Sequence, residues 1–181
     1  ALGGVMEGLG SAAFYGVGKG LESLWRSVKN STTGLTIMSR NSGRGNPSAI
    51  THFDVDLNTR QKNLLQHLSD YDSSVIINKS DVSLRDLAAL TAKTGDEFAM
   101  FTRGSQRMII RGNTNGVNIN KDIAQELYNA GFKWSGHTHP GNGTNVLFSS
   151  SGDRYILEQF KQAQSVILDR RGNYNIFEIG E

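Results

Sequence analysis

Two histidines and one distant carboxylate are the residues of this sequence best suited to hold a metal ion. His137 and His139 lie in Gly136-His-Thr-His-Pro140, and Asp153 ends the later segment Ser150-Ser-Gly-Asp153. Alternate side chains of an extended chain point to the same side, so both imidazoles can bind one ion. If the loop between His139 and Asp153 folds back, Asp153 joins the two histidines and completes the three protein ligands of a catalytic zinc site. Zinc in such a site lowers the pKa of its bound water toward ~7 and polarises a carbonyl group.

The composition narrows the chemistry that the chain can perform. It has no cysteine, which excludes disulfides, thiolate zinc sites, cysteine nucleophiles, iron–sulfur clusters and the cytidine-deaminase type of zinc site. The net charge of +2 is too small to indicate a nucleic-acid surface by itself. No stretch approaches the roughly 20 apolar residues that cross a bilayer, so we expect no membrane span. The remaining histidines, His52 and His67, have no neighbours that suggest a ligand role, and we expect them to be surface or structural residues.

The elements that must position the histidines alternate along the chain in a way that predicts a mixed α/β domain. The apolar spacing of Ile123, Ala124 and Leu127, for example, favours a helix that ends before Gly131. The segment Ser83-Leu-Arg-Asp86 resembles a capping box at the start of another helix. Expected helices cover residues 58–70, 84–94, 120–130 and 152–164, and expected strands cover residues 49–57, 74–78, 97–102, 107–111, 132–136, 165–168 and 175–179.

The first 48 residues differ in composition from the rest. Seven of the first twenty residues are glycine, and no basic segment precedes the apolar residues as it would in a secretory signal. Leu21, Leu24, Trp25 and Val28 have the spacing of one helix face, and residues 30–48 are rich in Ser, Thr, Asn and Gly. We therefore expect a Gly-rich connector, a short helix and a linker over residues 1–48, and a compact domain over residues 49–181.

His-Thr-His-Pro followed by Ser-x-x-Asp resembles the motif of the JAMM (JAB1/MPN/Mov34) zinc metallopeptidases. That family places a catalytic glutamate upstream, near the start of a strand. Glu97 stands in the matching place, forty residues before His137, and Asp96 is the alternative. The resemblance covers about residues 95–181 and, more weakly, residues 50–94. It implies a mixed β-sheet flanked by helices.

The resemblance also implies a role for each residue of the motif. His137, His139 and Asp153 would hold Zn²⁺, and Glu97 would act as general base and then general acid. Ser150 would donate a hydrogen bond to the oxyanion of the tetrahedral intermediate. The loop between His139 and Asp153 has thirteen residues, more than is usual in the family, which leaves Ser149 and Ser151 as alternatives to Ser150.

The layout of the chain resembles the C-terminal toxin modules of bacterial polymorphic toxins, including the Rhs/YD-repeat type. It implies a secreted effector that leaves the cytoplasm of the producing cell and acts inside a target cell. Its partners would be a protein or peptide substrate and a cognate immunity protein. Two alternatives remain: a metal-dependent nuclease, and a non-catalytic JAMM-like binding module.

Two further side-chain groups have an expected place. Trp134, three residues before His137, belongs either to the core or to a substrate groove, and we favour the core. Arg103, Arg107 and Arg111 lie in the expected hairpin, and we expect them on a solvated edge strand.

Overall fold

The computed structural model describes residues 55–141 and 143–180, together with the backbone of residues 14–15. Apart from those two residues, the predicted connector, short helix and linker over residues 1–48 lie outside the described residues, as do residues 49–54 of the predicted first strand. Residues 55–57, the described end of that strand, form no regular secondary structure, so the prediction is wrong there.

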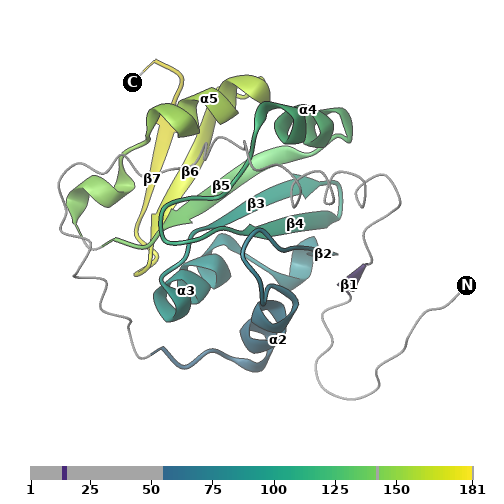
Figure 1. Cartoon of the computed structure of the whole chain (residues 1–181), viewed down its shortest axis with the longest axis vertical. Coiled ribbons are helices and arrows are strands. Elements are labelled where there is room, and N and C mark those ends of the chain that lie inside the picture. The colour runs from purple at the N-terminus through teal and green to yellow at the C-terminus, as the bar shows by residue number, and fades with distance from the viewer. Residues whose placement is uncertain (1–13, 16–54, 142, 181) are drawn as a thin grey trace, which may run out of the picture.

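The structure confirms an α/β fold built on one mixed sheet (Figure 1). Six strands form the sheet in the order β2-β4-β3-β5-β6-β7, and the two-residue strand β1 (Phe14–Tyr15) pairs with β2 at one edge. Neighbouring strands are antiparallel except β5 and β6, which are parallel. The strand bounds are Ser74–Asn78 for β2, Phe98–Arg103 for β3, Gln106–Arg111 for β4, Lys133–His139 for β5, Gln164–Asp169 for β6 and Tyr174–Glu178 for β7.

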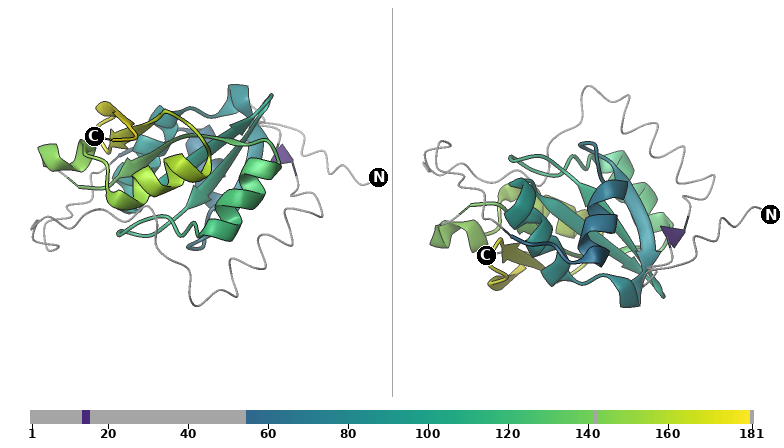
Figure 2. Two further views of the ribbon diagram at one scale, coloured as in Figure 1. Left: turned by 90° about the horizontal axis from the view of Figure 1, so that it is seen from above. Right: turned by 90° about the horizontal axis from the view of Figure 1, so that it is seen from below.

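In the described part of the chain, four helices cover the two faces of the sheet (Figures 1 and 2). α2 (Thr59–His67) and α3 (Leu84–Thr94) lie on one face, and α4 (Lys121–Asn129) and α5 (Ser151–Gln159) lie on the other. Each face has its own buried cluster of apolar side chains, with Leu87 in the first and Trp134 in the second. The described chain also contains two 3₁₀ helices, η2 (Lys79–Asp81) and η3 (Thr144–Leu147).

The predicted elements are present, but several boundaries differ. α2 and α5 end at His67 and Gln159, before the predicted ends, while β5 continues three residues beyond Gly136 and so includes both histidines. The expected solvated edge for the arginine-rich hairpin is wrong, because β3 and β4 lie inside the sheet. Their arginines instead bond to neighbouring groups, for example Arg103 to the carbonyl of Ala130.

A bulge in β5 sets the direction of the side chains that precede the histidines. Met100 opposes Gly136 and Phe101 opposes Trp134, so Ser135 is an extra residue in the ladder. Gly136 has φ +148°, and a Cβ on it would lie 2.7 Å from the carbonyl oxygen of Val166 in β6. We infer that only glycine allows β6 to pack this closely against the bulge.

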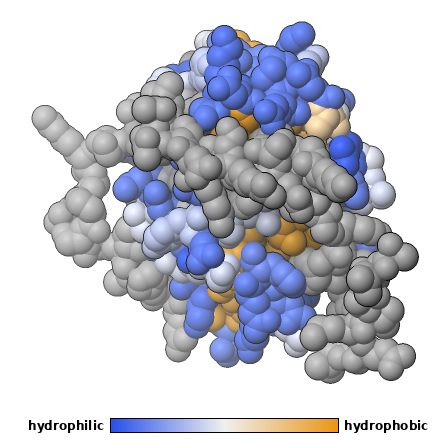
Figure 3. Space-filling view, turned by 45° about the vertical axis from the view of Figure 1, so that its right-hand side comes forward, coloured by the Kyte–Doolittle hydropathy of each residue, from blue (hydrophilic) through white to orange (hydrophobic). Residues whose placement is uncertain are grey.

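On the face seen in Figure 3, the described residues are mostly hydrophilic, with smaller hydrophobic areas between them. Among the described residues, the large apolar side chains with the greatest exposure are Tyr174 and Phe148, at 67% and 65%. Among the described residues, no helix is both long enough and apolar enough to cross a membrane.

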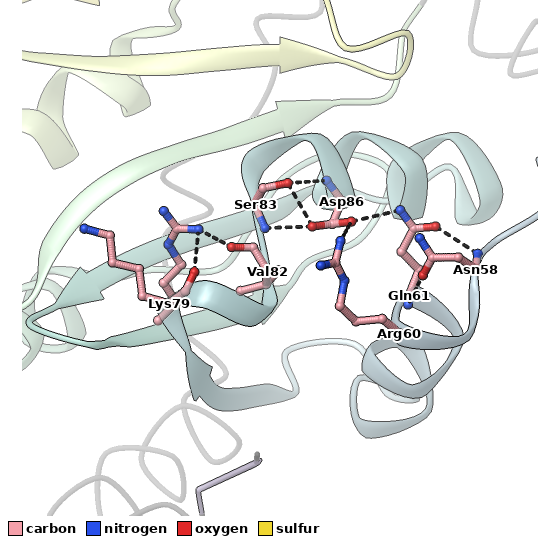
Figure 4. A network of polar contacts seen from close by, with 8 residues as sticks. Asn58, Arg60, Gln61, Lys79, Val82, Ser83 and Asp86 are labelled. Atoms are coloured by element: carbon pink, nitrogen blue, oxygen red, sulfur yellow. Dashed lines mark hydrogen bonds and ion pairs between the residues drawn. The ribbon is translucent and has the colours of Figure 1, made fainter. Parts of the chain in front are cut away.

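A polar network around Asp86 joins α2 to the start of α3 (Figure 4). Asp86 Oδ2 accepts hydrogen bonds from the backbone N–H and the hydroxyl of Ser83, the N-cap of α3. Asp86 Oδ1 accepts from Arg60 at 2.7 Å and from Gln61 at 2.9 Å. Burial alone would raise the pKa of Asp86, but its bonds to Ser83, Gln61 and Arg60 outweigh burial and lower it.

We expect Asp86→Ala to lower the free energy of unfolding by about 2 kcal/mol, because it leaves buried donors without an acceptor. Since the pKa of Asp86 is lower in the folded state, its stabilisation is present above the pKa of the unfolded carboxyl and disappears as pH falls through the folded value. Urea unfolding at neutral and acidic pH measures both effects. Glu126→Ala, on an exposed position of α4, is the control and should change stability by less than about 0.5 kcal/mol. Equal losses in both variants would contradict the prediction.

Candidate metal centre

The three residues predicted to bind metal lie together in the structure. His137 and His139 are in the last three residues of β5, and Asp153 is in the first turn of α5. α5 is part of the connection between the parallel strands β5 and β6. Such a connection starts at the carboxyl end of β5 and returns to the amino end of β6, so the helix begins near the carboxyl end of β5. One potential ligand atom from each of the three residues lies within 4.8 Å of the others.

The distances between these atoms fit a common cation. His137 Nε2 is 2.9 Å from His139 Nε2 and 3.1 Å from Asp153 Oδ1. Tetrahedral ligands with bonds of about 2.05 Å to zinc stand roughly 3.3 Å apart, so a displacement of a few tenths of an ångström would accommodate the ion. Imidazole nitrogen and carboxylate oxygen are also the donors that zinc accepts in proteins. The residues present therefore fit a zinc ion.

Hydrogen bonding orients His139 for this role. Its Nδ1 lies 2.5 Å from the carbonyl oxygen of Val146 in η3, and a carbonyl accepts only a protonated nitrogen. With the proton on Nδ1, the lone pair of His139 is on Nε2, the atom that faces His137 and Asp153. Side-chain types along the sequence do not predict a carbonyl group at this position.

Apolar rings surround His137. Its ring stacks on Trp134, with ring centroids 5.1 Å apart, and meets the edge of Phe177 from β7 at 6.3 Å. The bulge in β5 allows Trp134 and His137, three residues apart, to share this face of the sheet. Trp134 is only 1% exposed, which confirms the predicted core position. It also packs directly against the candidate metal ligand.

Asp153 is positioned by the start of its own helix. Its Oδ2 accepts a hydrogen bond of 2.6 Å from the backbone N–H of Ser150, and Ser150 Oγ accepts one from the backbone N–H of Asp153. This reciprocal capping box leaves Oδ1 facing His137. Burial alone would raise the pKa of Asp153, but the two histidines and the Ser150 N–H outweigh burial and lower it. The carboxylate form, which a metal ion needs, is therefore favoured.

Glu97 lies immediately before β3, which pairs with the histidine strand. Ala99 opposes His137 at the end of the β3–β5 ladder. From this register, extended by two residues, we infer that Glu97 lies opposite His139 and that its side chain is on the face of the candidate metal ligands. Glu97 is 0% exposed. Asp96, the alternative, binds Arg111 in an ion pair of 2.7 Å, which assigns it a structural role.

The serines of the loop have different surroundings. Ser150 is 3% exposed and caps α5 beside Asp153. Ser149 Oγ accepts a hydrogen bond from Arg154, and Ser151 is exposed on the first turn of the helix. Of the three serines, Ser150 is the one for which a hydrogen bond to a candidate ligand, Asp153, is found in the described residues. The other described histidine, His67, is exposed at the end of α2, as expected, whereas His52 lies outside the described residues.

Thr138, between the two histidines, was not singled out from the sequence. Its side chain points to the opposite face of the sheet, where its hydroxyl shares a hydrogen bond of 2.5 Å with Thr91 of α3. The backbone N–H of Phe98 also donates to this hydroxyl, at 3.0 Å. Both threonines are completely buried. Thr138 therefore fixes the histidine strand to β3 and α3 at the level of the candidate ligands.

We expect Thr138→Val to lower the free energy of unfolding by about 1–3 kcal/mol, because the buried N–H of Phe98 loses its acceptor. Since His137 and His139 flank Thr138, zinc affinity should also fall, within the range of about 10–100-fold typical of groups that orient ligands. Zinc titration against a competing chelator measures the affinity. Thr102→Val is the control, because it removes a similar hydrogen bond between two hydroxyl groups, those of Thr102 and Ser135. An equal loss of zinc affinity in both variants would count against this role.

We compared the chain with protein-family models, with curated proteins and with solved structures, and none of the three comparisons found a match.

Proposed function

We propose that this chain is a JAMM-like, zinc-dependent hydrolase that cleaves peptide or isopeptide bonds. The observation that carries the proposal is the convergence of His137, His139 and Asp153 with their candidate ligand atoms within 4.8 Å of one another. Three protein ligands of these types are the set found in catalytic zinc sites, in which a fourth position stays open. A bound ion would supply Lewis-acid polarisation of the substrate carbonyl and activation of water.

The chain itself would supply proton transfer and oxyanion stabilisation. Glu97, a buried carboxylate immediately before β3, is proposed to accept a proton from the attacking water and to donate it to the leaving amine. Ser150 is proposed to donate a hydrogen bond from its hydroxyl group to the developing oxyanion. Its Oγ already accepts the N–H of Asp153, which leaves the hydroxyl proton available to donate elsewhere.

A second candidate function is a closed metal site that only stabilises the fold of a binding module. The specific observation in its favour is that His137, His139 and Asp153 are at most 1% exposed. Structural zinc sites are closed in this way, although they normally have four protein ligands. Both candidate functions require bound zinc, but only the hydrolase converts a substrate.

Metal content and turnover of the purified chain test the proposal. Zinc bound in a 1:1 ratio, and cleavage of a peptide library that stops after chelation and returns with zinc, would support the hydrolase. Stoichiometric zinc without cleavage would favour the structural site. Absence of zinc binding would contradict both candidates. Cleavage of plasmid DNA or RNA by the zinc-loaded chain, without peptide cleavage, would favour the nuclease alternative.

We also propose, from the layout of the chain, that the hydrolase is the effector of a delivered bacterial toxin and that a cognate immunity protein neutralises it. Expression of the chain in the cytoplasm of a bacterial host should then arrest growth. Expression of the Glu97→Gln variant at the same level should not. Normal growth with the active wild-type enzyme would contradict the toxin role and leave the hydrolase proposal intact.

A further inference from the structure

The strand at one side of the sheet, β7, has an open edge in the described part of the chain. β7 comes last in the strand order and pairs only with β6 among the described residues, whereas β2, toward the other side, pairs with β1 (Figure 1). Natural proteins commonly protect an edge strand with proline, lysine or a bulge. β7 contains neither proline nor lysine, and its five residues pair with β6 without a bulge. Its outer side is therefore suited to pair with another strand.

Backbone hydrogen bonds show which residues of β7 would form such a pair. The N–H of Ile179 donates to the carbonyl of Ala163 at 3.3 Å, and the carbonyl of Asn173 accepts from the N–H of Asp169 at 2.9 Å. Along an antiparallel strand these groups point alternately to one neighbour and to the other, so the odd-numbered residues of β7 face β6. The residues whose N–H and C=O groups point to the outer side are Tyr174, Ile176 and Glu178.

The same three residues have exposed side chains. Phe177 is buried in the cluster that includes residues of α5, so the alternate side chains of β7 point to the opposite face. Five large apolar residues of the described chain are exposed, and three of them gather here: Tyr174 at 67%, Ile176 at 45% and Ile179 at 47%. Apolar side chains gathered beside an unpaired strand indicate an interaction surface. We call the outer side of Tyr174–Glu178 the β7 edge.

The β7 edge is complementary to a second copy of itself in antiparallel direction. In a register centred on Ile176, each Ile176 faces Ile176 of the second copy, and Tyr174 faces Glu178 on either side. Every outward N–H and C=O group of the three residues then has a partner, because all three belong to hydrogen-bonded pairs. The two-fold symmetry of this contact closes the assembly at a dimer.

The charge of Glu178 also favours the antiparallel direction. Parallel pairing in register would place two Glu178 carboxylates side by side, which destabilises a pair of strands. Antiparallel pairing separates them and places each carboxylate beside the hydroxyl group of Tyr174, which can donate a hydrogen bond to it. We propose that the chain forms a two-fold dimer in which the β7 edges of two copies pair in antiparallel direction and join the two sheets into one.

Sedimentation analysis of the whole chain over a range of concentrations tests the proposal. A chelator is present throughout, so that a metal ion cannot link two copies and the result is independent of the hydrolase proposal. Because a five-residue edge makes a small interface, we expect a monomer–dimer equilibrium with a Kd of about 1–100 µM. Hydrogen exchange at the amides of Tyr174, Ile176 and Glu178 should slow as the concentration rises through this range.

Two charge variants of Ile176 test the register. Ile176→Lys and Ile176→Glu change an exposed side chain, so the fold should persist, and each variant alone should dimerise at least about tenfold more weakly because like charges face each other. An equimolar mixture should regain dimers that contain one copy of each variant, since opposite charges then meet. Tyr71→Lys replaces an exposed apolar residue away from the β7 edge, at 60% exposure, and should change the Kd less than about twofold.

Three results would overturn the proposal. The first is a wild-type chain that stays monomeric at about 1 mM, a concentration well above the expected Kd. The second is a mixture of the folded Ile176→Lys and Ile176→Glu variants that associates no better than either variant alone. The third is slow exchange of the three outward amides at every concentration, which would show that a segment of the same chain covers the β7 edge.

Discussion

Replacing Glu97 by glutamine in the zinc-loaded chain is expected to lower kcat for peptide cleavage by about 10²–10⁴-fold. Glutamine has nearly the same shape but cannot accept and return a proton. Glu97 is not among the three ligand residues, so zinc should remain bound in a 1:1 ratio. Steady-state kinetics and metal analysis of the same sample measure the two quantities.

Asp96→Asn is the matched control for Glu97→Gln. Asp96 is also buried and adjacent in sequence, but its carboxylate binds Arg111. Its amide variant should lose stability and keep kcat in the fraction of protein that remains folded. If Glu97→Gln retains wild-type kcat while Asp96→Asn loses it, the assignment of the proton-transfer residue is wrong.

Asp153→Asn is expected to weaken zinc binding by more than about 100-fold, beyond the range for groups that only orient ligands. An amide has one oxygen, so it can either cap α5 at Ser150 or face His137, and the native carboxylate does both. Zinc at a thousand times its Kd should stabilise the wild-type chain by about 4 kcal/mol and the variant far less. Thermal unfolding with and without zinc measures this difference.

The chain contains its own control for this experiment. Asp86 occupies the same position of a capping box as Asp153, but its second oxygen binds Arg60 and Gln61 instead of facing a histidine. Asp86→Asn should lower stability in the absence of metal and leave the stabilisation by zinc unchanged. A wild-type response to zinc in Asp153→Asn would exclude this carboxylate as a ligand.

The order of helices and strands could be predicted because apolar spacing and capping residues are local signals. Ser83 and Asp86 form the predicted capping box, and α4 ends before Gly131 as predicted. The boundaries near the candidate metal centre were harder to predict. His137 and His139 are polar residues in a strand that is buried by tertiary packing, so their hydrophobicity gives no sign that β5 continues to them.

The convergence of His137, His139 and Asp153 was predicted from residue types and from resemblance to a known motif. The groups that orient them were not, for two physical reasons. The carbonyl of Val146 is a backbone group, which every residue possesses. Thr138 reaches Thr91, 47 residues away, and a contact of that range depends on the packing of α3 against the sheet. Spacing along the chain carries no information about either contact.

The parallel pairing of β5 with β6 has a consequence for folding kinetics. Antiparallel neighbours such as β3 and β4 can form from a short hairpin, whereas β5 and β6 can pair only after the whole segment containing η3 and α5 has folded back. His139 precedes the loop of that segment and Asp153 follows it. The two side chains therefore come together late in folding. An ion that bridges them would therefore extend the lifetime of the native state by slowing unfolding, with little effect on the rate of folding.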